Sequence, residues 1–174
     1  RGLRYPLRRQ RQMCIRDRPH GNYQKLVVEE MKDKPKSGNI VTEDGEVLGK
    51  HNGLFNYTIG QRKGLGIAYK HPLYVIGFNG ERNEVIVGPN DRLFTNRMIC
   101  KFYNFLDDTI HKELKAEGKI RYAANPSPCT ARILDDDTME VIFEEPQRAI
   151  TPGQSVAFYN GTQLLGGAVI DRVC

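Results

Sequence analysis

Beyond residue 38, short apolar runs alternate with turns rich in glycine, asparagine and aspartate. Runs of this length with dense turn signals are typical of a small β-barrel, and not of a parallel sheet whose strands alternate with helices. We therefore predict a mainly β protein. The expected strands are residues 39–42, 46–48, 73–78, 84–87, 98–105, 119–122, 129–134, 139–143, 155–159 and 162–170.

Three dipeptides mark turns between neighbouring strands. Asp44-Gly45 is a sequence typical of a type I′ hairpin turn, because glycine and aspartate tolerate the positive φ angles that this turn requires. Asn79-Gly80 predicts a second turn, and Asn160-Gly161 predicts a third hairpin.

A single short helix is expected before the strands, over residues 22–32, where Asn22 is a suitable N-cap. Proline and glycine in residues 33–38 end it and indicate a domain boundary. The predicted organisation is a helix in residues 19–37, a small central β domain in 38–97, and a six-stranded-type antiparallel β-barrel in 98–174.

The net charge of +5 comes from the first 18 residues, which contain seven arginines and one acidic residue. The remaining residues carry 19 basic and 20 acidic side chains, so any RNA-binding surface there must be a local patch. Residues 1–18 also lack apolar periodicity. We interpret them as a non-native or disordered segment; a basic RNA-binding arm is the alternative.

No complete catalytic site is predicted from the residue types. The four cysteines (Cys14, Cys100, Cys129 and Cys174) form no Cys-x-x-Cys pair, and the four histidines have no metal-ligand spacing. We therefore expect no metal site and no disulfide framework. No apolar run approaches the ~20 residues of a membrane span, so a soluble, cytoplasmic protein without a membrane partner is expected.

A glycine-rich stretch at residues 57–67 is the densest local signal, with Gly60, Gly64 and Gly66 next to Arg62 and Lys63. Glycines allow a backbone to approach a ligand closely. The spacing matches neither a Walker loop nor a dinucleotide-binding fingerprint. A plain turn with solvated charges and a phosphate-contact loop both remain open.

Two further segments are candidates for contacts with nucleic acid. Arg121 and Tyr122 can grip a phosphate and stack on a base or ribose, although an edge-strand arginine beside a half-buried tyrosine is the alternative. Gln154 follows Pro152-Gly153 and can hydrogen-bond a base edge from that turn, for which a purely structural turn is the alternative.

Three motifs together resemble those of bacterial tRNA-specific 2-thiouridylases, in the same order and at compatible distances. The resemblance runs from about residue 19 to residue 170. The motifs are HNGL through TIGQRKGLGI in residues 51–67, KIRY in residues 119–122, and EEPQRAITPGQSVAFY in residues 144–159.

Members of this family replace O2 of the wobble uridine of certain tRNAs with sulfur. The resemblance implies an N-terminal domain that adenylates the uridine with ATP, two cysteines that transfer persulfide sulfur from a sulfur-donor protein, and a monomeric enzyme. It also implies that this chain, as the central and barrel domains, binds tRNA, holds no ATP and is inactive alone. Residues 19–37 would then be the exit from the catalytic domain.

By the same resemblance, Arg121, Tyr122 and Gln154 are the tRNA-contact positions. Gly60, Gln61 and Arg62 are expected near the tRNA or at the seam between the two domains. No residue of the chain is assigned to catalysis or to cofactor binding.

The chain departs from the family pattern at its second cysteine. Counting back from Pro19, this cysteine belongs at position 16, which is Arg16, and Cys14 is out of register. We therefore expect a wrongly joined reading frame near residue 18. The rival interpretations are a free-standing, non-enzymatic RNA-binding β-barrel and an intact enzyme that uses Cys14.

Overall fold

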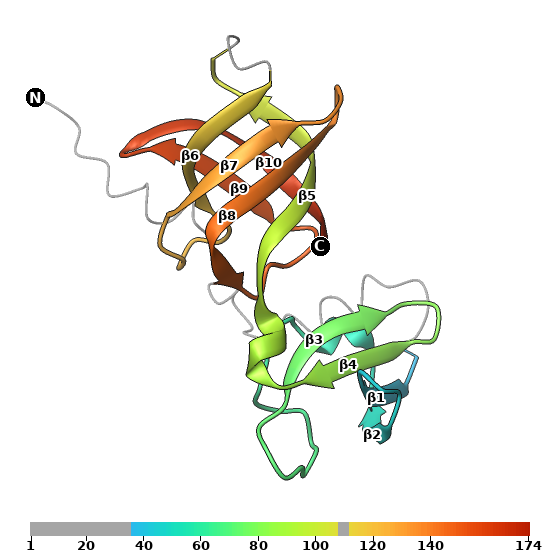
Figure 1. The fold of residues 1–174 in the computed structure, drawn as a ribbon. Helices are drawn as coiled ribbons and strands as arrows, with labels where there is room; N and C mark the ends of the chain where they lie inside the picture. Colours follow the sequence, from blue (N-terminus) through green and yellow to red (C-terminus); the bar gives the residue numbers. More distant parts are fainter. Residues whose placement is uncertain (1–35, 108–111) are drawn as a thin grey trace, which may run out of the picture.

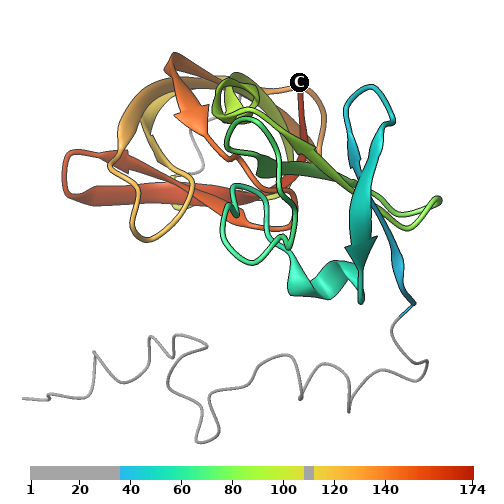
Figure 2. The same ribbon diagram turned by 90° about the horizontal axis from the view of Figure 1, so that it is seen from below.

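The computed structural model describes residues 36–107 and 112–174, which form ten strands in two sheets (Figures 1 and 2). Within these residues the only helices are two short 3₁₀ segments, η3 (Leu54–Asn56) and η4 (Asn90–Leu93). The predicted helix at 22–32, the arginine-rich residues 1–18 and Cys14 lie outside the described residues. The prediction of a mainly β protein is confirmed.

The central domain is a four-stranded sheet in the order β2-β1-β4-β3. Its strands are β1 (Gly38–Thr42), β2 (Val47–His51), β3 (Tyr74–Asn79) and β4 (Glu84–Gly88). β1 and β4 pair in parallel and so join two antiparallel hairpins. One face of the sheet buries a small apolar core, which consists of Ile40, Leu65, Leu73, Val75, Val85 and Val87.

The turn at Asp44-Gly45 forms, but the prediction of type I′ is wrong. Only Gly45 has a positive φ (86°), whereas a type I′ turn needs positive φ at both central residues. The Gly45 N–H donates to Thr42 O at 3.1 Å, and the Thr42 N–H donates to Glu46 O at 2.9 Å. These bonds close a three-residue loop with a left-handed glycine, so β2 begins at Val47 instead of at residue 46.

The second sheet closes into an antiparallel barrel in the order β10-β5-β8-β7-β6-β9, as predicted. Its core is apolar and fully enclosed, with Phe143, Phe158, Met98 and Met139 among its largest side chains. The strands are β5 (Phe94–Phe105), β6 (Glu113–Lys119), β7 (Ser127–Ile133), β8 (Thr138–Arg148), β9 (Ser155–Asn160) and β10 (Gln163–Val173).

The prediction of a strand at 119–122 is wrong. The strand is β6 (Glu113–Lys119), and Arg121 and Tyr122 lie in the turn that follows it, where the Ala124 N–H donates to Arg121 O at 3.1 Å. Sequence analysis missed β6 because its residues, ELKAEGK, are mostly charged or small. Hydrogen-bonded pairing with β7 on one side and β9 on the other holds these residues extended, although their local propensity does not favour a strand.

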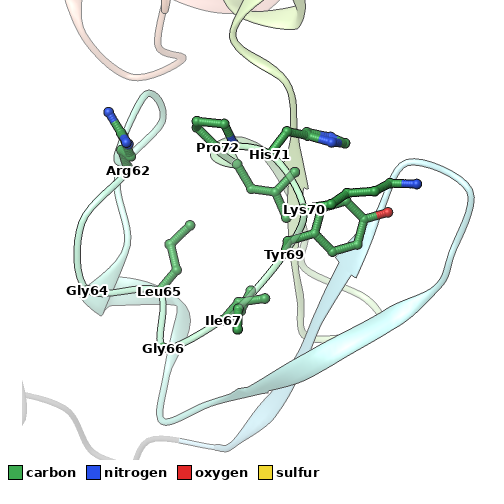
Figure 3. A pocket seen from close by; sticks show the side chains of 11 residues that line it. Arg62, Gly64, Leu65, Gly66, Ile67, Tyr69, Lys70, His71 and Pro72 are labelled. Carbon is green, nitrogen blue, oxygen red and sulfur yellow. The ribbon is translucent and has the colours of Figure 1, made fainter.

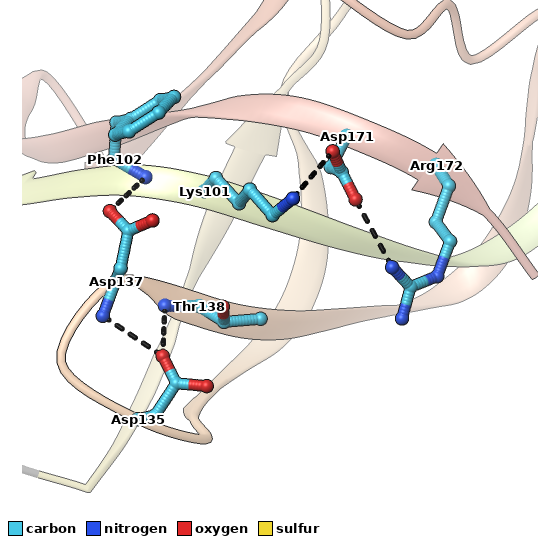
Figure 4. Close-up of polar contacts among 7 residues, drawn as sticks. All are labelled: Lys101, Phe102, Asp135, Asp137, Thr138, Asp171 and Arg172. Carbon is cyan, nitrogen blue, oxygen red and sulfur yellow. Dashed lines mark hydrogen bonds and ion pairs between the residues drawn. The ribbon is translucent and has the colours of Figure 1, made fainter.

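A bulge in β5 is held by Asp137, which precedes β8 (Figure 4). Phe102 has a positive φ of 52°, and its N–H donates to both the backbone carbonyl and the carboxylate of Asp137. The Asp135 carboxylate accepts the N–H groups of Asp137 and Thr138, and the first of these bonds is the main cause of its lowered pKa. Residues 135–137 therefore form a structural turn between β7 and β8.

Candidate nucleic-acid interface

Two loops and the start of β5 meet at the barrel end that faces the central domain (Figure 1). β6 and β8 run in one direction, and β5, β7 and β9 run in the other. The β6–β7 loop and the β8–β9 loop therefore share one end of the barrel with the beginning of β5. This topology brings Arg121, Tyr122 and Gln154 to the same end, although they are far apart in the sequence.

Arg121 and Tyr122 are both exposed in the β6–β7 loop. Arg121 Nη2 donates to Arg148 O at 2.8 Å, which ties this loop to the end of β8 and leaves the other guanidinium N–H groups available. Tyr122 is 79% exposed, and Lys119 Nζ lies 5.6 Å from its ring centroid. The pair therefore presents an aromatic face flanked by two cations.

Gln154 is exposed on a fixed backbone. Gly153 has a φ of 84°, and the Gln154 N–H donates to Thr151 O at 3.2 Å, so residues 151–154 form a turn with Pro152 and glycine at its centre. The carbonyl of Gln154 accepts the Ile170 N–H at 2.8 Å, which anchors the turn to β10. The side-chain amide is thereby presented to solvent on a rigid support.

Gly60 lies at the seam between the two domains. A Cβ atom at this position would be 3.1 Å from Ala149 Cβ and 3.3 Å from Arg148 Nη1, so a larger residue would push the domains apart. Gln61 is engaged within its own loop: its Oε1 accepts the Thr58 N–H, and its Nε2 donates to Lys63 O, both at 3.0 Å. Arg62, in contrast, is exposed.

Arg148 links these elements, and sequence analysis did not single it out. Its Nε donates to Asn90 Oδ1 at 3.2 Å, and its guanidinium lies 5.5 Å from the ring centroid of Tyr74 in β3. Its carbonyl accepts the bond from Arg121. Arg148 therefore connects the central domain to the barrel loop. It stands inside the third motif, but no local pattern reveals partners 58 and 74 positions away.

The cysteines of the barrel core are not suited to carry sulfur. Cys100 and Cys129 are buried, and burial raises the pKa of each thiol to about 12. A nucleophilic cysteine is instead exposed and has a lowered pKa. Within the described residues there is also no cluster of ligands that could hold a metal ion.

We expect Cys174, which is exposed, to be alkylated at about pH 8 while Cys100 and Cys129 stay unmodified until the protein is unfolded. Peptide mass spectrometry after alkylation, with and without denaturant, checks this expectation. Rapid labelling of either core cysteine in the folded protein would contradict it.

The free energy of unfolding, measured over a pH series, should fall as the pH rises from about 9 towards 12. The reason is that the unfolded chain releases the thiol protons of Cys100 and Cys129 at lower pH than the folded barrel does.

Comparison with known proteins matches the two domains separately. Residues 25–89 match a tRNA methyl transferase PRC-barrel domain, and residues 95–170 match an aminomethyltransferase beta-barrel domain. No helix within the described residues is long and apolar enough to cross a membrane.

Curated relatives match across both domains, and each named here is a tRNA-specific 2-thiouridylase MnmA. The protein of Clostridioides difficile strain 630 is 42% identical over 91% of this chain and 43% of its own length. That of Geotalea uraniireducens is 44% identical over 88% and 41%, and one from Clostridium tetani is 46% identical over 91% and 43%. The chain thus spans less than half the length of these relatives.

Proposed function

Since the chain belongs to the tRNA-specific 2-thiouridylase family, we propose that it is the tRNA-binding part of an enzyme that replaces O2 of the wobble uridine with sulfur. The observation that carries this proposal is the shared position of Arg121, Tyr122 and Gln154 at the barrel end next to the central domain. A guanidinium, an exposed aromatic ring and an amide are the groups with which proteins grip phosphate and unstacked bases.

ATP is the cofactor of the proposed whole enzyme, but the described residues contain no phosphate-cradling loop of the kind that binds its triphosphate. The glycine-rich segment at 60–66 lacks the Gly-Lys-Ser/Thr ending of a phosphate-cradling loop. The two buried thiols are equally unsuited to sulfur transfer. We therefore propose that residues 36–107 and 112–174 contribute the grip on tRNA, that adenylation takes place outside them, and that the buried Cys100 and Cys129 take no part in sulfur transfer.

The partners proposed for the whole enzyme are those that the family resemblance implies. Its substrate is tRNA, its sulfur comes from a persulfide-carrying donor protein, and it acts as a monomer in the cytoplasm, where tRNA and ATP are present. The net charge of the chain beyond residue 18 is close to zero, so attraction of RNA must come from the local patch and not from a long-range field.

A chimeric enzyme tests the proposed function directly. Residues 36–174 would replace the corresponding domains of the Clostridioides difficile relative, and 2-thiouridine would be measured in unmodified tRNA incubated with ATP and a sulfur donor. We expect the chimera to thiolate tRNA, because the grafted domains supply the contacts that hold the substrate. A chimera that folds and adenylates but neither binds nor thiolates tRNA would refute the proposal.

A further inference from the structure

The central domain contains a pocket on its own long loop (Figure 3). The loop is closed at its base by two backbone bonds, from the Gly60 N–H to Val75 O at 2.7 Å and from the Val75 N–H to Gln61 O at 2.9 Å. It borders an open pocket of ≈ 620 Å³ lined by Arg62 and residues 64–73. This volume lies within the range of ordinary small-ligand pockets.

The pocket loop is basic and has no compensating acid. Residues 60–73 contain Arg62, Lys63, Lys70 and His71 but no aspartate or glutamate. None of the ion pairs among the described residues involves these side chains, whereas several other exposed arginines and lysines do have acidic partners. A pocket lined by unpaired cations favours an anionic ligand. Here the charge is local, because the chain beyond residue 18 has a net charge close to zero.

An aromatic face accompanies these cations. Tyr69 is 37% exposed, and Lys70 Nζ lies 5.9 Å from its ring centroid. The His71 ring meets Tyr69 edge-on at 4.9 Å, which holds the tyrosine ring in place. An aromatic face beside an ammonium group suits a ligand that combines a flat base with a phosphate.

The loop is rigidly seated, and its backbone is open to a ligand. Leu65 and Leu73 are buried in the core of the central domain and anchor both sides of the pocket. Gly66 directly follows Leu65. It has a φ of 68°, and no atom lies within 4 Å of the position where its Cβ would be. Glycine is therefore needed for the backbone conformation, and the space around it is free.

The pocket loop also begins at the seam with the barrel. Its first residue, Gly60, lies against Arg148, and the Arg148 carbonyl is bonded to Arg121. A nucleic acid that contacts Arg121 can therefore continue across the seam towards the central domain.

We propose that this pocket holds one nucleotide, with its base against Tyr69 and its phosphate beside Lys70. This proposal rests on the proposed function, under which the nucleotide belongs to the bound tRNA. A free mononucleotide would present the same chemistry. The central domain then makes a second contact with RNA, separate from the one at the barrel end.

Titration of labelled tRNA into the full chain tests the pocket, with excess duplex RNA present to occupy the seven arginines of residues 1–18, which would bind any RNA. Tyr69→Ala should weaken tRNA binding about fivefold, at the low end of the contribution of a stacked base, and Tyr69→Phe should restore it. Lys70→Gln should weaken binding and reduce the salt slope by about one unit, whereas Lys50→Gln, an exposed lysine of β2 outside the pocket, should change neither. Circular dichroism confirms that each variant is folded.

The possible outcomes distinguish a failure of the pocket proposal from a failure of the proposed function. If Arg121→Ala weakens tRNA binding but the Tyr69 and Lys70 variants bind like the parent chain, the pocket proposal is wrong and the proposed function stands. If the chain binds no tRNA, the proposed function is wrong, and uridine 5′-monophosphate and inorganic phosphate are titrated while the amide resonances of residues 64–71 are followed by NMR. Changes in these amide resonances on addition of the nucleotide would then support a free-nucleotide site. Their absence would refute the pocket proposal.

Discussion

Replacement of Phe158 by alanine is expected to lower the free energy of unfolding by about 3–5 kcal/mol, a large part of the stability of a domain of this size. Phe158 is fully buried in the barrel, and its ring centroid lies 6.0 Å from that of Phe105. Its strand, β9, closes the barrel between β6 and β10, so the cavity left by the ring cannot collapse without disturbing two pairings.

Urea unfolding followed by circular dichroism measures this loss. The matched control is Phe102→Ala, because Phe102 is 69% exposed on the same barrel and should cost less than about 1 kcal/mol. Equal midpoints for the two variants would mean that the barrel core is not packed as described. The ordering of the two effects is expected to hold even if their absolute size varies with how far the cavity relaxes.

Replacement of Arg121 by alanine should weaken tRNA binding by about 1–3 kcal/mol and reduce the salt slope by about one unit. The reason is that a phosphate contact by arginine releases one counterion from the RNA. The bond to Arg148 O engages only one guanidinium nitrogen, so the side chain is oriented and still able to bind phosphate. Gln154→Ala should weaken binding with little change in slope, because a neutral amide releases no counterion.

Binding should be measured over a salt series with residues 1–18 removed, because their seven arginines would bind any RNA. Arg132→Ala is the matched control: this exposed arginine lies in β7 and is paired with Glu113 at 2.8 Å, away from the β6–β7 loop. If the trimmed chain binds tRNA equally well with and without Arg121, the proposed contact is wrong. A similar loss for Arg132→Ala would show that the effect is one of general charge.

Much of the fold can be predicted from the sequence because turn chemistry is local. Asn160-Gly161 and Asp44-Gly45 mark the hairpins where the chain reverses, and the apolar runs between turns become the buried faces of the strands. The exact turn type at Asp44 was less predictable, because it depends on the φ of a residue that tolerates two conformations. The charged strand β6 was missed because it owes its conformation to neighbours on both sides.

The class of fold, the barrel and the residues that carry the family resemblance can be read from the sequence, since these depend on local pattern and on residue identity. The shared position of the β6–β7 and β8–β9 loops at one end of the barrel, and the contacts of Arg148 with Tyr74 and Asn90, are visible only in the folded protein. Such contacts depend on strand direction and on how the two domains meet. Strand direction and the packing of the two domains produce no periodic pattern in the sequence. A single side chain can contact partners far away in the sequence without changing the residue pattern around it.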